Sequence, residues 1–556
     1  MHLRFMAVFG ILAVVFAVLV LFTGSGWRNA LRALEGMEKV KSQDLVLANV
    51  HWGFYWGFVV NAVLATGLAL TAGWWGKSRP TNDAPSPSKL MGRQWLWLLL
   101  ILGLAGGLRW ARLDLSLYND EAHNFRRYFA GYFQDRPDGT QRWREPSWVE
   151  TLWLNKVGNN STPFSAMARL GYTAASKWTG APQGSVLETG LRLPAWIAGM
   201  ASLLLLWMFM RRLMPDSTAC WWFLLFASLH PWHVRYSSEA RGYGFLVLGV
   251  SAVLYFTLRA WQENKWRWWL LMGVAQFFSI WSFSGSLYYF VAFNGALLAG
   301  WTWSNLKRGE RWSQAVRPLV GMTLGAMLTI PLMLPMLPQL LGALKSNTSI
   351  HGHMGAGWWA DVLGNFAAGI RWNDGDAANP LNLAIARFLS AWPFLWLVVA
   401  AYFVIVAAGG YSLSCRHGFA RVILFASPLA VCLSWYLMGN SGNYIHLWYL
   451  VHSLPGWLMV LAVGAAASSQ RWLNIGLGVG AAVVLLCWFG LDLRLATQGK
   501  ENLRGVAQAV PQGAFHVAAY SDVDIYDRNI HILEAPSQLD PWIAEAKAAQ
   551  RPFYFS

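Results

Sequence analysis

The chain has 556 residues, of which 56% are hydrophobic, only 13% are charged and 36 are tryptophan. Soluble domains carry roughly a quarter charged residues, so this composition and the recurring apolar runs predict a polytopic membrane protein. The net charge is +16, but Lys and Arg are spread among short loops between apolar runs rather than along one stripe. That distribution argues against a nucleic-acid partner.

The apolar runs predict about thirteen transmembrane helices, because each is close to the roughly 20 residues that cross the hydrocarbon layer. They lie near residues 4–23, 52–73, 94–109, 189–210, 218–234, 240–259, 266–283, 286–304, 317–340, 383–408, 420–438, 447–468 and 472–490. The first run is long for a signal peptide and no clear small-residue cleavage site follows it, so we expect a retained helix.

Four regions are expected along the chain. Residues 1–73 form an N-terminal two-helix membrane extension, 74–93 are a Pro/Ser-rich basic linker, and 94–490 form the main membrane domain. Residues 491–556 are predicted to be a small α/β unit. Within that unit we expect strands in "GAFHVAAY", "IHILEA" and "RPFYF" and a helix in "DPWIAEAKAAQ".

The basic loops predict the orientation of the bundle. The linker 74–93 and the loops that contain Arg211–Arg212, "WQENKWRW", "LKRGERW", "CRHGFAR" and "SSQR" should be cytoplasmic by the positive-inside rule. The opposite, outer face then receives the loops 110–188, 230–241, 282–286, 341–382 and 439–446 and the C-terminal tail. Most of the remaining carboxylates, histidines and arginines therefore gather on one face.

The stretch "SLYNDEAHNF" (116–125) places Asp120 and Glu121 just beyond an apolar run. A charge at the bilayer centre costs roughly 2.5–3.5 kcal/mol on insertion scales, so both carboxylates should lie at the interface. A dry wall on one side can there raise a carboxyl pKa towards that of a useful general base. On these residues alone, a solvated loop without catalytic function is an equally good interpretation.

A second polar group follows in "HPWHVRYSSEARGYGF" (230–245), between two apolar runs with almost no spacer. Its charged members Arg235, Glu239 and Arg241 must reach the outer surface or face a protein-lined cavity. A guanidinium group there suits a phosphate, because its forked donors bind two phosphate oxygens at once. The alternative is an Arg–Glu ion pair between helix ends.

Four segments in order resemble one enzyme family. They are "YNDEAHNF" (118–125), "LRLPAWIAGMASLLLLW" (191–207), "HPWHVRYSSEARGYGF" (230–245) and "WYLVHSLPGWLMVLA" (448–462). The set resembles polyprenyl-phosphate-sugar-dependent glycosyltransferases of the GT-C fold, which include protein O-mannosyltransferases and the lipid A aminoarabinose transferase. The resemblance covers roughly 94–490 and the tail. It implies an all-α polytopic membrane protein with outer-face loop helices and a small C-terminal α/β appendage.

The resemblance also implies residue roles. Asp120 takes the place of the catalytic base, and Glu121 supports it or helps to hold a divalent cation, the one cofactor considered. Arg241 corresponds to the arginine expected at the donor phosphate, with Tyr243 beside it and Arg235 as a further candidate.

Two segments depart from the family pattern. "NNSTPF" (159–164) stands where the family has Asn-His-Pro-Pro-Leu, and Trp448 stands where it has the arginine of Arg-Tyr-Leu. Binding of the donor phosphate would then shift to other residues, for which His446, His452 and Lys156 are candidates. Loss of that binding, and with it of activity, is the other interpretation.

The function expected from these observations is inverting transfer of a sugar from a polyprenyl-phosphate donor to an acceptor hydroxyl at the outer face of a bacterial plasma membrane. The acceptor, whether protein, lipid or polysaccharide, is left open, and membrane lipids are the other expected partners. The main alternative is a transporter or flippase of an amphipathic anion. Transporters place polar groups near the midplane on symmetry-related broken helices, whereas this chain shows no internal repeat and has its polar groups at one face. A non-catalytic scaffold would make Asp120 dispensable.

Overall fold

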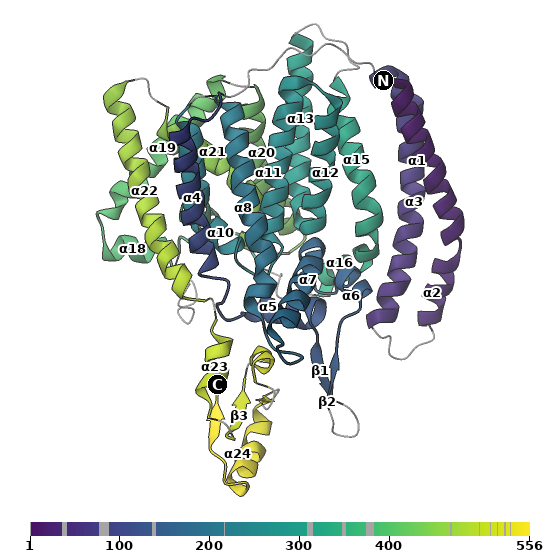
Figure 1. Ribbon diagram of the computed structural model, residues 1–556, viewed down its shortest axis with the longest axis vertical. Coiled ribbons are helices and arrows are strands. Elements are labelled where there is room, and N and C mark those ends of the chain that lie inside the picture. Colours follow the sequence, from purple (N-terminus) through teal and green to yellow (C-terminus); the bar gives the residue numbers. More distant parts are fainter. Residues whose placement is uncertain are drawn as a thin grey trace.

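The computed structural model describes residues 2–35, 42–76, 88–135, 141–215, 217–307, 315–346, 352–373, 383–416, 418–467, 470–499, 501–511, 513–519, 521–527, 530–533 and 535–556. Long helices run side by side and form one bundle, with short elements collected at one end (Figure 1). Within these ranges, nine helices are long and apolar enough to cross a membrane. The chain is therefore a multi-pass membrane protein, while the expected number of thirteen spans is not confirmed.

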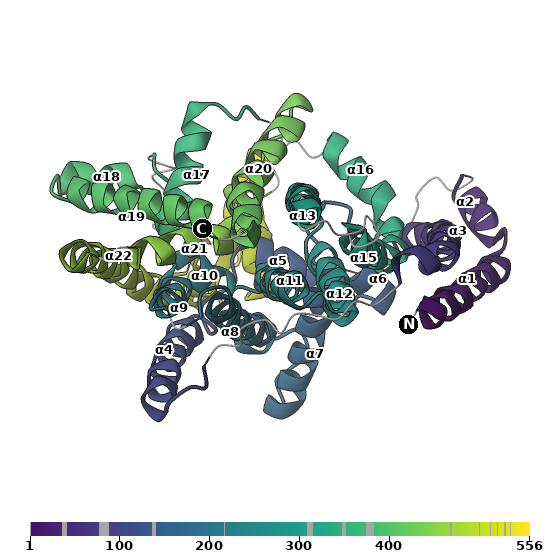
Figure 2. The same cartoon turned by 90° about the horizontal axis from the view of Figure 1, so that it is seen from above.

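The long helices follow the apolar runs closely. They are α1 (His2–Thr23), α3 (Ser42–Trp75), α4 (Gly92–Trp110), α8 (Glu188–Leu213), α9 (Ala219–Leu229), α11 (Tyr243–Glu263), α12 (Trp266–Ser282), α13 (Leu287–Lys307), α15 (Arg317–Met333), α19 (Leu395–Arg416), α20 (Gly418–Asn440), α21 (Leu454–Ala465) and α22 (Arg471–Thr497). Figure 2, seen from above, shows that they do not form a ring and that α1 and α3 lie at one edge of the bundle.

Two expected spans are divided by proline. The run 218–234 ends as a helix at Leu229, and a separate short helix, α10 (Pro231–Tyr236), follows. The run 383–408 becomes α18 (Ile385–Ala391) and α19, with Pro393 between them. Proline lacks an N–H and disfavours helical geometry in the residue before it, so continuous apolar sequence does not make one continuous helix here.

The N-terminal helices pack directly on the main bundle, and α2 (Gly26–Glu35) connects them on the side of the short elements (Figure 1). α3 approaches α15 and the turn η3 (Leu334–Met336) through two glycines. A Cβ atom on Gly53 would lie 2.4 Å from the backbone nitrogen of Pro335, and one on Gly57 would lie 2.7 Å from Cα of Pro331. Asn61 Nδ2 also donates to the Met327 carbonyl at 2.7 Å. These contacts hold α15 and η3 against α3.

The short elements lie at the end of the bundle predicted to be the outer face. They are α5 (Asn119–Asn124), the π-helix η1 (Phe125–Phe129), β1 (Tyr132–Asp135), β2 (Gln141–Arg144), α6 (Trp148–Trp153), α7 (Thr162–Thr179), η2 (Ser284–Ser286), α16 (Leu337–Ser346), α17 (Ala356–Ala368) and η5 (Leu447–Ser453). β1 and β2 form an antiparallel hairpin in which Tyr132 lies opposite Arg144. Loops far apart in the sequence are thus brought together.

The C-terminal residues form a small α/β unit that projects from the same end (Figure 1). Its elements are α23 (Leu503–Ala509), β3 (Phe515–Ala518), η6 (Ser521–Ile525), β4 (His531–Ile532), η7 (Pro536–Gln538), α24 (Leu539–Ala548) and β5 (Phe553–Phe555). The strands are parallel in the order β4-β3-β5, with Val517 opposite both His531 and Phe555. The strands are shorter than the sequence suggested, and α24 matches the expected helix.

Candidate active site

A cavity of about 710 Å³ opens where the short elements meet the bundle. One part of its wall is apolar and comes from α15, η3 and α16, with Ile330, Met333, Leu334, Leu337, Leu340, Leu341 and Leu344. Another part is polar and carries Asn119, Asp120, His123, Asn159, Arg241 and His446. The cavity therefore offers an amphipathic ligand both a hydrocarbon surface and a charged group.

Asp120 is the second residue of α5, and its side chain is 35% exposed on the cavity wall. Its Oδ2 lies 3.6 Å from Nη1 of Arg241. This separation is an ion pair but is longer than a hydrogen bond. The two residues that the sequence proposed as base and phosphate ligand therefore lie side by side, although 121 residues separate them in the chain.

Arg241 is fixed in the turn that precedes α11. Its neighbour Gly242 has no space for a side chain, because a Cβ there would lie 2.2 Å from Cβ of Ser161. Nη2 of Arg241 donates to the Tyr243 hydroxyl at 3.4 Å, while its buried Nη1 has no hydrogen-bond partner among the described residues. Burial opposes the guanidinium charge, but Asp120 holds the pKa of Arg241 well above its usual value. Arg241 is therefore a charged group with unused hydrogen-bonding capacity.

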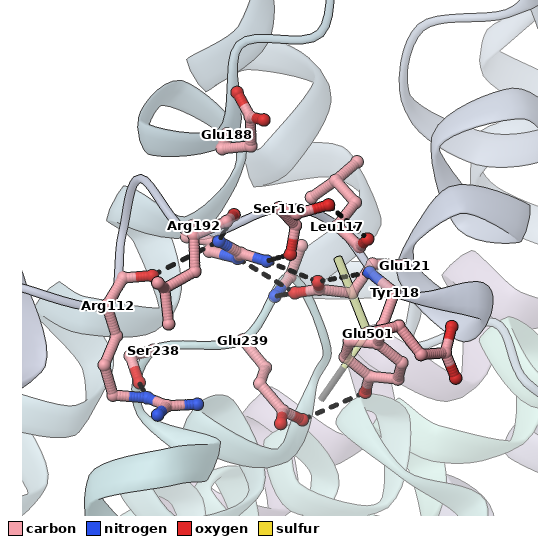
Figure 3. Close-up of polar contacts among 12 residues, drawn as sticks. Arg112, Ser116, Leu117, Tyr118, Glu121, Glu188, Arg192, Ser238, Glu239 and Glu501 are labelled. Carbon is pink, nitrogen blue, oxygen red and sulfur yellow. Dashed lines mark hydrogen bonds and ion pairs between the residues drawn. The ribbon is translucent and has the colours of Figure 1, made fainter. Parts of the chain in front are cut away.

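Glu121, the next residue on α5, lies away from the cavity and is completely buried. Arg192 of α8 grips it at both oxygens, with Nε to Oε1 at 3.0 Å and Nη2 to Oε2 at 2.5 Å (Figure 3). The backbone N–H groups of Ala240 and Tyr118 donate to the same carboxylate at 2.5 and 3.3 Å. With both oxygens bonded to a cation, Glu121 does not fit the role of a metal ligand. No cluster of three or more His, Cys, Asp and Glu side chains in the described ranges is placed to hold a metal ion.

The loop before α5 is fastened by the same arginine. Arg192 also donates to the carbonyls of Arg112, Leu113 and Leu115 and, at 3.0 Å, to that of Ser116. Every nitrogen of its guanidinium group is thus in use. Because Arg192 comes from the "LRLP" segment and Glu121 from "YNDEAHNF", two of the segments that resemble the enzyme family meet in one ion pair.

Arg235 is also committed to a protein partner. Its Nε donates to Oε1 of Glu239 at 2.6 Å. The hydroxyl of Tyr118 donates to Oε2 of Glu239 at 3.0 Å (Figure 3). Arg235 is not part of the cavity wall. For this residue the structure has the Arg–Glu pair that was the alternative to a phosphate site.

The C-terminal unit contacts the same loop from the other side. Glu501 accepts a hydrogen bond from the backbone N–H of Asn119 at 2.8 Å. The hydroxyl of Tyr526 accepts from the N–H of Leu117 and donates to Oε1 of Glu188, both at 2.8 Å. Arg126 pairs with Asp522 and Asp524 of η6. The residues around Asp120 are thus held between the bundle and the C-terminal unit.

The remaining candidates are only partly on the cavity. His446 and His452 line it. The His446 ring stacks on that of Trp448, with centroids 4.5 Å apart, and His452 bonds to Ser453 at 3.0 Å. Trp448, in the position of the family arginine, is itself part of the wall. Lys156 is half-buried beside lining residues 157–159 but does not belong to the lining.

Sequence reasoning did not single out two residues that the structure places at the site, Arg192 and Tyr526, and it considered His123 only as one of several outer-face histidines, for interfacial hydrogen bonding or a metal ion. An arginine at the start of an apolar run is costly in a membrane, so Arg192 carried a signal in the sequence. Nothing in the local sequence indicated a role for Tyr526, because its partner Leu117 is 409 residues away. His123 lines the cavity three residues after Asp120, on the same face of α5. Burial, and then the charges of Arg127 and Arg241, lower the pKa of His123 to about 4.

Comparison with known proteins supports the resemblance. Residues 183–337 match the family described as dolichyl-phosphate-mannose-protein mannosyltransferase. That range contains two of the four resembling segments, 191–207 and 230–245. The resemblance is confirmed over these residues. No curated protein matches the chain.

Several solved structures align with most of this chain at low sequence identity. ArnT from Cupriavidus metallidurans bound to undecaprenyl phosphate has 13% identity and a TM-score of 0.47, covering 82% of this chain and 89% of that one. Its apo form has 12% identity and a TM-score of 0.44, covering 83% and 90%. The arabinosyltransferase EmbB from Mycobacterium smegmatis has 14% identity and a TM-score of 0.43, covering 79% of this chain and 42% of that chain.

Proposed function

We propose that this protein is a membrane glycosyltransferase that moves a sugar from a polyprenyl-phosphate-linked donor to an acceptor hydroxyl. One observation carries the proposal. Asp120 and Arg241 lie 3.6 Å apart on the wall of a cavity whose other wall is apolar. A carboxylate, a cation and a hydrocarbon surface are the three features that such a donor and its reaction need.

Each part of the donor has a matching part of the cavity. The leucines of η3 and α16, with Ile330 and Met333 of α15, provide a surface for the polyprenyl chain. The guanidinium group of Arg241 provides charge-assisted hydrogen bonds for phosphate oxygens. Asp120 lies next to that group and is partly exposed, so an acceptor arriving from water can reach it.

The reaction follows from this order of groups. Asp120 takes the proton of the acceptor hydroxyl, and the acceptor oxygen attacks the anomeric carbon of the sugar. The bond from that carbon to the phosphate oxygen breaks, and both of its electrons go to the phosphate. Arg241 stabilises the negative charge that develops there. One displacement of this kind inverts the anomeric configuration.

The test is a transfer assay with the full-length protein in proteoliposomes that contain radiolabelled polyprenyl-phosphate-linked sugars, with protein, lipid and polysaccharide fractions of the cell envelope added as sources of the acceptor hydroxyl. We expect labelled sugar to leave the lipid and polyprenyl phosphate to accumulate. Movement of the intact glycolipid across the bilayer without cleavage would contradict the proposal and favour a transporter. A protein that neither cleaves nor moves the glycolipid would favour a scaffold.

We further propose that this site faces the periplasm from a bacterial inner membrane, because Arg211 and Arg212 lie in the last turn of α8, at the end away from the short elements (Figure 1). In a variant whose four natural cysteines are replaced, Gln183→Cys should react with an impermeant maleimide in intact spheroplasts. Arg93→Cys should react only after lysis. The reverse labelling pattern would contradict this orientation.

A further inference from the structure

Two buried nitrogens on the cavity residues lack hydrogen-bond partners among the described residues: Nη1 of Arg241 and Nε2 of His123. A buried polar atom without a partner costs roughly 1–3 kcal/mol, and such atoms are uncommon in native structures. Hydrogen bonds at catalytic sites commonly form or tighten only when substrate binds. Their presence on one wall therefore indicates that a ligand completes both groups.

The charges around His123 indicate what kind of ligand this is. Burial, and then the charges of Arg127 and Arg241, lower the pKa of the imidazole, and Arg127 is exposed. The third neighbouring arginine, Arg126, is already paired with Asp522 and Asp524. Of the residues that the structure describes, Asp120 is the one carboxylate that also acts on His123, and it is already paired with Arg241. An anion in the cavity would still gain from the charge of Arg241, from the more distant charge of Arg127 and from a further N–H donor on His123.

We infer that His123 is a ligand of the donor phosphate and, with Arg241, replaces the arginine that Trp448 displaces in this chain. The inference rests on the proposed function and extends it to a residue with no assigned role. In that role an N–H of the imidazole donates to a phosphate oxygen. When the bond from the anomeric carbon to that phosphate breaks, the phosphate becomes more negative and this hydrogen bond becomes stronger.

The geometry of α5 explains why one short helix can provide both groups. Asp120 and His123 are three residues apart and therefore lie on the same face, whereas Glu121 is turned to the other side and held by Arg192. The widened turn η1 follows immediately at Phe125 and carries Arg127. A π-helical turn of this kind is frequent at functional sites.

The experiment measures binding of two probes, a polyprenyl monophosphate and the matching polyprenol, to the full-length protein in nanodiscs. His123→Phe keeps a flat ring without nitrogens, His123→Gln restores a donor, and His353→Phe, at an exposed histidine outside the cavity lining, is the control. We expect His123→Phe to bind the phosphate about 10-fold more weakly, the usual value of one hydrogen bond to a charged group. Polyprenol binding should stay unchanged, and His123→Gln should recover most of the loss.

Equal affinity of wild type and His123→Phe for the phosphate would overturn the inference, as would an equal loss for both lipids. Normal phosphate affinity with reduced turnover would overturn it in favour of a contact to the sugar. Failure of the wild-type protein to prefer the phosphate over the polyprenol would instead contradict the proposed function itself. The two failures are therefore distinguishable.

Discussion

Asp120 and Glu121 are neighbours on α5, but their surroundings are opposite. Glu121 is fully buried and bonded to Arg192 and to two backbone N–H groups. Asp120 is 35% exposed on a cavity and lies 3.6 Å from Arg241. One carboxylate has its hydrogen bonds satisfied inside the protein, and the other faces the space that a substrate would fill.

Arg192, which pairs with Glu121, and Arg241, which pairs with Asp120, differ in the same way. All three nitrogens of Arg192 donate to protein oxygens, whereas Nη1 of Arg241 has no hydrogen bond among the described residues. Removing one partner of a fully bonded buried pair leaves an uncompensated charge. A group with unused donors can bind a ligand without breaking a protein contact. Charge alone therefore does not distinguish a structural ion pair from a site, but hydrogen-bond saturation does.

The largest expected effect concerns the structural pair. Glu121→Ala leaves the Arg192 guanidinium buried without its counter-charge, and we expect it to lower the free energy of unfolding by about 3–5 kcal/mol. Thermal unfolding in mild detergent measures the change, with Glu145→Ala at an exposed carboxylate of the same loop as the control. A Glu121→Ala protein that is as stable as the control but inactive would assign Glu121 to the chemistry instead.

The next effect concerns the arginine with unused donors. We expect Arg241→Ala to weaken binding of polyprenyl phosphate by about 10- to 100-fold, since hydrogen bonds to charged groups are the stronger ones. Lys at this position should recover only part, because an ammonium group is a point charge rather than a fork. Arg142→Ala, at an exposed arginine of β2, is the control. Unchanged affinity for polyprenyl phosphate together with a large loss of stability would show that Arg241, like Arg192, has a structural role and does not bind the phosphate.

The smallest effect concerns the C-terminal unit. Tyr526→Phe removes the hydroxyl that bonds to Leu117 and Glu188, each contact contributing about 0.5–1.5 kcal/mol. We expect kcat to fall several-fold while affinity for polyprenyl phosphate stays the same, because the loop before Asp120 loses support but Arg241 does not. Tyr554→Phe, in the same unit, is the matched control. If kcat is unchanged, the unit does not position Asp120.

Much of this arrangement could be predicted from the sequence. The apolar runs located the long helices, and the short polar segments indicated that loops at one face would meet. The pairing of Asp120 with Arg241 was foreseen only as a shared face, but the structure gives a direct contact. The proline rules predict the helix breaks at Pro231 and Pro393, whereas the length and apolarity of the two runs predict continuous spans.

Other features required the folded chain. Nothing in "YNDEAHNF" shows which carboxylate turns inward, because adjacent helix positions differ by about 100° and either could face the core. The answer depends on Arg192, 71 residues further along. The role of Glu501 and Tyr526 likewise depends on how the C-terminal unit packs against α5, which local sequence patterns do not encode.

The central claim is that Asp120 acts in catalysis whereas Glu121 has a structural role. Its most direct test is to measure the turnover of Asp120→Asn together with its thermal stability. Asn keeps the size and hydrogen-bonding capacity of the side chain but cannot accept the acceptor's proton. We predict that turnover falls by ~10²–10⁴, the usual contribution of a positioned general base, while the melting temperature and the affinity for polyprenyl phosphate remain those of the parent. An Asp120→Asn enzyme with parental turnover would contradict the account.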